Sequence, residues 1–102
     1  MIVRTWNGRV PIDQADGFHR HLLATGIGDY RQRAGCTDIA LWRRDQDGWA
    51  VFTLVSTWQD LDSIRRYAGD DHERARLYPD DEAHGLVPDL SVVHHQLLNI
   101  DP

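Results

Sequence analysis

Histidine is the side chain in this sequence best suited to exchange protons, because its unperturbed pKa of about 6.5 lies near neutral pH. The 102 residues contain six histidines. His94 and His95 are adjacent, so on a strand one of them points toward a cleft and the other points away from it. His72 and His84 lie in the polar segment 70–87. These histidines are the first candidates for acid–base chemistry.

The residue pattern gives little support to metal or nucleophile chemistry. His19 and His21 are two residues apart on a predicted helix, so they point in different directions and do not form a metal-binding i, i+4 pair. Cys36 is the only cysteine, which excludes an intramolecular disulfide and a recognisable zinc site. No glycine-rich phosphate loop and no serine or cysteine nucleophile with a partner is present. The sequence therefore predicts no metal and no cofactor, and it disfavours nucleotide and flavin.

The first half of the chain is predicted to form a strand, a helix and a second strand. Residues 2–9 alternate at period two, which is typical of a strand. Pro11 suits the first turn of a helix, in which apolar residues recur at three-to-four spacing as far as Gly26. A short helical piece is expected at 29–33, and the second strand at 37–45.

The second half of the chain continues with a strand, a helix and a final strand. Gln46-Asp47-Gly48 contains an Asp-Gly turn signal, and residues 49–58 are rich in β-branched and aromatic side chains, so the second and third strands form a hairpin. Asp60 can cap a helix that ends at Gly69. The last strand is expected at 90–100.

The order β-α-β-β-α-β predicts a ferredoxin-like α+β fold, with a four-stranded antiparallel sheet and both helices on one face. The other face of such a sheet needs a cover. Four large aromatic residues are too many for one side of so small a sheet, namely Trp42, Trp49, Phe52 and Trp58. We therefore predict a homodimer. No repeat or linker divides residues 1–102, so we expect one domain.

Composition narrows the classes of function. The chain is 41% hydrophobic and 26% charged, and its net charge is −5, which disfavours a nucleic-acid partner. No apolar run approaches the roughly 20 residues that span a bilayer, so no membrane association is expected. The N-terminus lacks the pattern of a signal peptide. We expect a soluble, cytoplasmic protein.

Several segments together give the chain a family resemblance. They are Met1–Trp6, Ser56-Thr57-Trp58, Ile64–Asp71, Glu73-Arg74-Ala75, Tyr78–Asp81 and Val93-His94-His95. Over nearly its whole length the chain resembles actinobacterial members of the antibiotic biosynthesis monooxygenase family. The resemblance implies a dimeric α+β barrel. It is less specific for chemistry, because the superfamily includes oxygenases, haem-degrading enzymes, cyclases, lyases and proteins without known activity.

The resemblance implies, first, a cofactor-independent monooxygenase that acts on an aromatic or polyketide intermediate of secondary metabolism. Dioxygen reacts poorly with closed-shell molecules, so the small hydrophobic or aromatic substrate must become an easily oxidised anion in a pocket that supplies a base or hydrogen-bond donors. Similar oxygenases use Asn, Trp and Tyr in these roles, and the corresponding candidates here are Asn7, Trp58, Tyr67 and Tyr78. We expect Asn7 to point into a cleft beneath the helices. Related chains often carry His at the position of His94, which favours His94 over His95 as the cleft residue.

Three alternatives remain open. A haem-binding or haem-degrading protein resembling this family would use Asn7 with an iron ligand at His72 or His84, because Tyr67 stands where the haem-degrading relatives carry Trp, and Leu77 or Tyr78 where they carry the ligating His. A polyketide cyclase would use a Tyr and a His a few residues apart, which Tyr67 and His72 imitate. A non-catalytic dimer that binds a small hydrophobic ligand needs no base at all.

Overall fold

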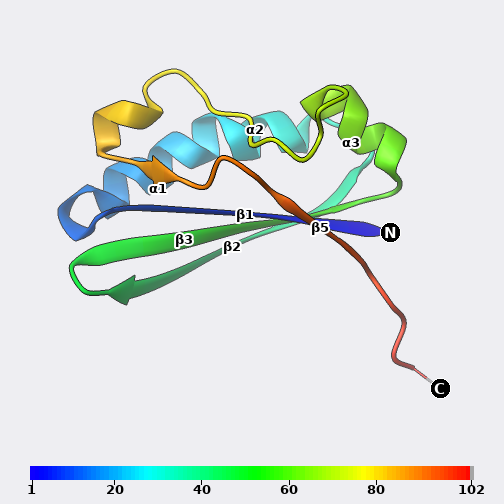
Figure 1. The fold of residues 1–102 in the computed structure, drawn as a ribbon, viewed down its shortest axis with the longest axis horizontal. Coiled ribbons are helices and arrows are strands. Elements are labelled where there is room, and N and C mark those ends of the chain that lie inside the picture. The colour runs from blue at the N-terminus through cyan, green and yellow to red at the C-terminus, as the bar shows by residue number, and fades with distance from the viewer. Residues whose placement is uncertain (102) are drawn as a thin grey trace.

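Strands and helices follow one another in the predicted α+β order (Figure 1). The structure is a computed structural model and describes residues 1–101. Its elements are β1 (Ile2–Pro11), the 3-10 helix η1 (Ile12–Gln14), α1 (Ala15–Ala24), α2 (Gly26–Arg31), β2 (Cys36–Gln46), β3 (Trp49–Trp58), α3 (Leu61–Ala68), the 3-10 helix η2 (Asp81–His84), β4 (Val87–Pro88) and β5 (Val93–Gln96). None of the helices described is long and apolar enough to cross a membrane.

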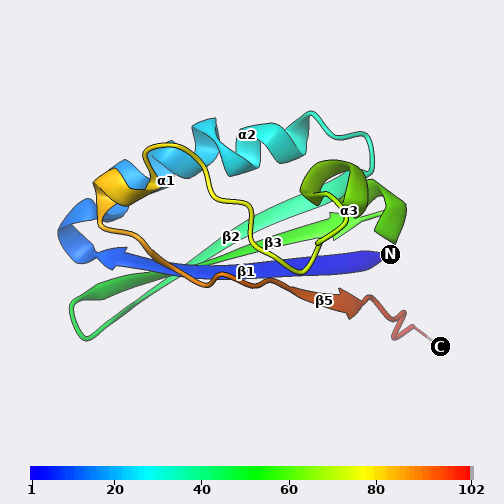
Figure 2. The same cartoon turned by 45° about the horizontal axis from the view of Figure 1, so that its top comes forward.

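The sheet is antiparallel throughout, in the order β2-β3-β1, with β4 and β5 both paired to the far side of β1. The prediction of one continuous last strand over 90–100 is wrong in extent. Residues 90–92 leave β1 and pair instead with the loop after α3, where Ala75 N–H donates to Leu90 O and Val92 N–H donates to Glu73 O. After β5 the chain runs away from the sheet (Figure 2).

Local sequence signals explain where the helices and turns begin and end. The Asp60 carboxylate accepts a hydrogen bond from Ser63 N–H and caps α3, and Gly69 follows the helix with a φ of 86°. The hairpin between β2 and β3 turns at Asp47 and Gly48, both with positive φ. Helix α2 starts at Gly26, whereas the sequence predicts a short helix that starts only at Asp29.

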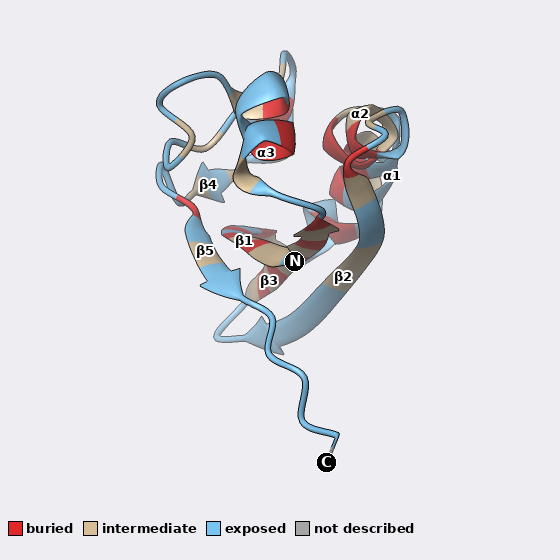
Figure 3. Ribbon diagram, turned by 90° about the vertical axis from the view of Figure 1, so that its right-hand side faces the viewer, coloured by how far each residue is buried: buried red, intermediate tan, exposed pale blue. Residues whose placement is uncertain are grey.

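The core lies between the helices and one face of the sheet, here called the inner face (Figure 3). Alternate residues of β3 are buried there, including Phe52, Leu54 and Trp58. The opposite, outer face carries no helix (Figure 3). The four aromatic residues divide between the two faces: Phe52 and Trp58 are buried inside, whereas Trp49 is half-buried and Trp42 is 60% exposed on the outer side.

Candidate functional site

A cavity lies between the inner face of the sheet and the helices. It is lined by Arg4, Trp6, Phe18, Leu22, Gly26, Tyr30, Leu54, Tyr67, Arg76, Leu77, Tyr78, Asp81 and Val92. Its free space is about 30 Å³, which is room for about one or two water molecules. The walls are mainly apolar and aromatic, with a few polar groups that converge. In this conformation the cavity therefore has very little free space.

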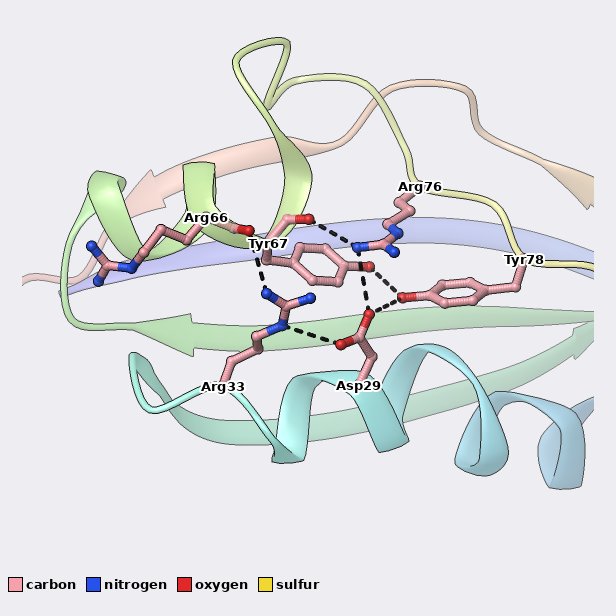
Figure 4. A network of polar contacts seen from close by, with 6 residues as sticks. All are labelled: Asp29, Arg33, Arg66, Tyr67, Arg76 and Tyr78. Carbon is pink, nitrogen blue, oxygen red and sulfur yellow. Dashed lines mark hydrogen bonds and ion pairs between the residues drawn. The ribbon is translucent and has the colours of Figure 1, made fainter.

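A chain of hydrogen bonds runs from the cavity wall to helix α2 (Figure 4). The Tyr78 hydroxyl donates to Asp29 Oδ2 at 2.9 Å. The Tyr67 and Tyr78 hydroxyl oxygens are also 2.9 Å apart. Because the single hydroxyl proton of Tyr78 is directed at Asp29, Tyr67 must be the donor to Tyr78. The Tyr67 oxygen then keeps its lone pairs for a further hydrogen bond.

Burial keeps both tyrosines in the protonated form. Burial, together with the neighbouring Tyr30, raises the pKa of Tyr67 far above its ordinary value of 10. Burial likewise raises the pKa of Tyr78 to about 12, although the hydrogen bond from Tyr67 acts in the opposite direction. At neutral pH the two hydroxyls therefore serve as hydrogen-bonding groups that can pass a proton on, and not as tyrosinates.

Two arginines hold Asp29 at the end of this chain (Figure 4). Arg33 Nε donates to Asp29 Oδ1 at 3.1 Å, and Arg76 Nη1 lies 3.5 Å from Asp29 Oδ2. Arg76 also donates to the backbone oxygen of Tyr67, and its guanidinium lies over the Tyr67 and Tyr78 rings. The arginines position both the carboxylate and the tyrosine rings.

A further arginine, Arg4 of β1, lines the cavity on the side of the sheet. Arg4 is 1% exposed and donates from Nη1 to the backbone oxygen of His72 and to His94 Nε2, the latter at 3.0 Å. A guanidinium has no acceptor, so His94 must accept at Nε2 and carry its proton on Nδ1. Burial, followed by the charge of Arg4, lowers the pKa of His94 from 6.5 to about 4. His94 is thus a neutral imidazole when Arg4 donates to it at neutral pH.

This neutral imidazole predicts a pH dependence of stability. Between pH 6.5 and about 4 the unfolded chain binds a proton at His94 that the folded chain does not, so the free energy of unfolding falls as the pH is lowered. We expect a contribution of about 1–2 kcal/mol, discounted because the ring is only partly buried. Urea unfolding of the wild type and of His94→Gln across this window measures it. The Gln amide oxygen can still accept from Arg4, and equal slopes for both proteins would contradict the assignment.

The segment before β4 is fastened over the cavity by an acid–histidine contact. His21 Nε2 and Asp81 Oδ1 are 2.6 Å apart, and Tyr78 N–H donates to Asp81 Oδ2 at 2.8 Å. The His84 ring packs against the His21 and Phe18 rings. These contacts join η2 to α1 and keep Tyr78 in the cavity wall.

The structure corrects the expected position of Asn7. The face of β1 beneath the helices carries Arg4, Trp6 and Val10, all buried, whereas Asn7 is exposed on the outer face and accepts from the Thr53 hydroxyl at 2.7 Å. Because side chains alternate along a strand, Asn7 cannot share the cavity with them. Trp6, which no sequence pattern singled out, lines the cavity instead.

The other predicted residues divide among four places. Tyr67 and Tyr78 line the cavity. Trp58 is fully buried behind it, with its indole N–H donating to Ser56 Oγ at 2.9 Å. His72 and His94 border a separate open groove, and His84 packs on α1. Tyr67 and His72, the expected cyclase pair, therefore do not meet, and neither His72 nor His84 reaches the cavity as a haem ligand.

Three polar residues of the site had no signal in the sequence: Arg4, Asp29 and Arg76. Each is one of many arginines or aspartates in the sequence, and its spacing from other polar residues matches no motif. The alternation along β1 already separates Arg4 and Trp6 from Asn7. It does not say which of the two faces the helices cover, and that choice decides which set reaches the cavity.

Solved structures share this fold. The chain matches along its full length a structure assigned as an antibiotic biosynthesis monooxygenase from Deinococcus radiodurans, with 15% identity, 97% coverage of that chain and a TM-score of 0.69. A Bacillus cereus structure assigned likewise gives 15% identity, coverage of 100% and 97%, and a TM-score of 0.64. A mutant of MhuD with two manganese protoporphyrin IX molecules bound per active site gives 16% identity, full coverage of both chains and a TM-score of 0.64.

No protein-family model and no curated protein matches the chain. The predicted resemblance is confirmed at the level of the fold, which is that of the antibiotic biosynthesis monooxygenase structures. The chain thus has the α+β fold of those structures, with a small, aromatic-walled cavity beneath its helices.

Proposed function

We propose that this protein is a cofactor-independent monooxygenase that oxidises a small aromatic substrate with an acidic C–H or O–H group, such as a polyketide-derived anthrone. The observation that carries the proposal is the hydrogen-bonded chain Tyr67–Tyr78–Asp29 in the wall of an apolar cavity. Such a chain offers a route for the proton that must leave before dioxygen can react. The fold shared with monooxygenase structures supports the same class of reaction.

In this proposal the substrate gives its acidic proton to the Tyr67 oxygen while Tyr67 passes its own proton to Tyr78, and Tyr78 protonates Asp29. The resulting anion transfers electrons to dioxygen and combines with it as a peroxide. Loss of water then converts the CH₂ group of an anthrone into a carbonyl. One oxygen atom ends in the product and the other in water, so the substrate supplies all the electrons and no external reductant is needed.

Substrate entry requires the cavity to enlarge, because ligand pockets usually have about 300–1,000 Å³ and the free space here is about 30 Å³. The segment that carries Leu77, Tyr78 and Asp81 is the wall we propose to move. It has no regular structure before η2, and Asp80 and Gly85 bracket η2 with φ values of 71° and 70°. The His21–Asp81 contact would then open and reclose with each turnover.

Oxygen uptake with 1,8-dihydroxyanthrone in the presence of a chelator tests this function. We expect the wild type to consume one dioxygen for each quinone formed, and Tyr67→Phe to lower the rate by about 10²-fold or more, since a catalytic proton transfer is typically worth that much. His19→Gln is the matched control, because His19 is an exposed residue on the solvent side of α1. Uptake no faster than in buffer, or release of hydrogen peroxide equal to the oxygen consumed, would contradict the proposal.

Haem binding is a second candidate, supported by an open groove of about 560 Å³ bordered by His72, His94 and His95 and by the porphyrin-bound MhuD structure of the same fold. His94 Nε2 is held by Arg4, whereas His72 Nε2 has no hydrogen-bond partner among the described residues. A haemin titration separates this candidate from the first. A saturable Soret shift that His72→Ala removes would favour haem, and silence in both assays would favour a non-catalytic ligand-binding protein.

The outer face of the sheet is the surface that we propose to pair with a second copy of this chain. It carries the exposed Trp42 and Val93 beside the half-buried Val51 and Val55 of β3, and no helix covers it (Figure 3). Burial of these aromatic and aliphatic side chains against a partner would remove apolar surface from water and so stabilise a dimer. The single domain and the cytoplasmic location stay predictions.

A further inference from the structure

Arg4 is a buried cation without an acidic partner. It is 1% exposed, and no carboxylate among residues 1–101 forms an ion pair with it. Two backbone oxygens and the neutral His94 receive three of its N–H groups. Nε is buried with no hydrogen-bond partner. Burial of a charge is costly unless the charge is paired, so this arrangement calls for an anion that the protein itself does not supply.

The other charged groups of the cavity wall are already matched. Arg76 lies 3.5 Å from Asp29, and its side chain is 44% exposed to water. Asp81 is paired with His21 and accepts from the backbone N–H of Tyr78. Among the charged residues that line the cavity, Arg4 therefore stands apart as the one whose charge has neither a counterion nor solvent.

The position of Arg4 relates it to the proton route. Its guanidinium carbon lies 5.7 Å from the centre of the Tyr67 ring, and both residues line the cavity. Nε–H and one N–H of Nη2 share an edge of the guanidinium, which is the edge that arginine uses to bind two oxygens or one oxyanion. Nη1 donates to His94 and to the backbone oxygen of His72, and one N–H of Nη2 donates to the backbone oxygen of Arg74. Nε–H and the second N–H of Nη2 are therefore left without a partner among the described residues.

We propose that the cavity binds its ligand as an oxyanion, a carboxylate or a phenolate, with Arg4 as the counterion. This inference rests on the proposed function, because it takes the same cavity as the substrate site. What it adds is that the bound substrate is negatively charged. The proton leaves through Tyr67, Tyr78 and Asp29, while the negative charge stays beside Arg4. The two tasks are thereby divided between the helix side and the strand side of one cavity.

Absorbance titration with 4-nitrophenol tests the charge preference directly, because its phenolate is yellow and its ionisation can be followed in the bound state. We expect the wild type to lower the pKa of the bound phenol by about one unit or more, a tenfold preference for the phenolate, as a nearby opposite charge does. 4-Nitroanisole, which cannot ionise, should bind at least tenfold more weakly than the phenolate. Equal binding of the two, or no saturable binding of either, would overturn the proposal.

Variants assign the preference to a residue. Arg4→Met replaces the guanidinium by a shorter, unbranched apolar side chain without charge and should abolish the pKa shift of the bound phenol. Arg9→Gln makes the same change of net charge on the outer face, where Arg9 is exposed and lies over the Trp49 ring, and should leave the shift intact. A shift that survives in Arg4→Met would overturn the assignment. If Arg4→Met does not fold, the phenolate preference of the wild type over 4-nitroanisole still decides the proposal.

Two further comparisons distinguish a carboxylate ligand from a phenolate, and the proposed anion site from the proposed monooxygenase activity. 4-Nitrobenzoate shows whether a carboxylate is preferred to a phenolate, and preference for either over 4-nitroanisole supports the oxyanion site. 4-Nitrophenol takes no part in oxygen uptake, so its titration is independent of catalysis. A phenolate preference without anthrone oxidation would leave the anion site standing and the monooxygenase wrong. Anthrone oxidation without a phenolate preference would give the reverse result.

Discussion

Asp29→Asn is expected to lower anthrone-dependent oxygen uptake by about 10²–10³-fold, in the range of a lost general acid–base catalyst. Asn is nearly the same size as Asp, but its amide cannot take up the proton that Tyr78 passes on. Initial rates of oxygen uptake at neutral pH measure the loss.

Matched variants separate the proton route from the structural role of Asp29, which also holds Arg33 and Arg76. Asp62→Asn makes the same change on α3 at a side chain that is 76% exposed, and should leave the rate unchanged. Tyr78→Phe should give a loss similar to that of Asp29→Asn, and the double variant little more, since both residues act in one chain. An unchanged rate in Asp29→Asn, or fully additive losses in the double variant, would contradict the route.

Trp58→Ala is expected to lower the free energy of unfolding by about 3–5 kcal/mol, the usual cost of truncating a buried Trp. Trp58 is fully buried, its ring lies edge-on to Tyr30 at 5.4 Å, and its indole donates to Ser56. Because small domains have only about 5–15 kcal/mol of stability, this variant should be close to unfolding at room temperature. Urea unfolding measures the loss.

The matched control removes the same side chain from the outer face. Trp42 is 60% exposed, so Trp42→Ala should cost less than about 1 kcal/mol. The comparison is made at low protein concentration, where pairing through the outer face adds least. If Trp58→Phe kept the wild-type melting temperature but lost oxygen uptake, Trp58 would have the catalytic role that the family resemblance implies, and its role in the core would be secondary.

Local signals were sufficient for the order and the ends of most elements. The capping side chain of Asp60 and the positive φ of Gly69 bound α3 as expected, because both depend on the backbone within a few residues. The Asp47-Gly48 turn set the register between β2 and β3, which continues from the pair Gln46–Trp49 to the pair Asp38–Thr57. The last strand was the exception, since residues 90–92 pair with residues 73–75, and no local pattern reports that pairing.

The sequence by itself determined the α+β fold, the division of aromatic residues between two faces and two tyrosines of the site. Only the tertiary structure decided which face of β1 lies beneath the helices, and thereby placed Arg4 and Trp6 in the cavity and Asn7 outside it. It also joined Tyr78 to Asp29 across 49 residues and Arg4 to His94 across 90 residues. The physical reason is that periodicity defines which side chains share a face. Which polar groups then meet depends on how the elements pack, and spacing along the chain carries no information about that.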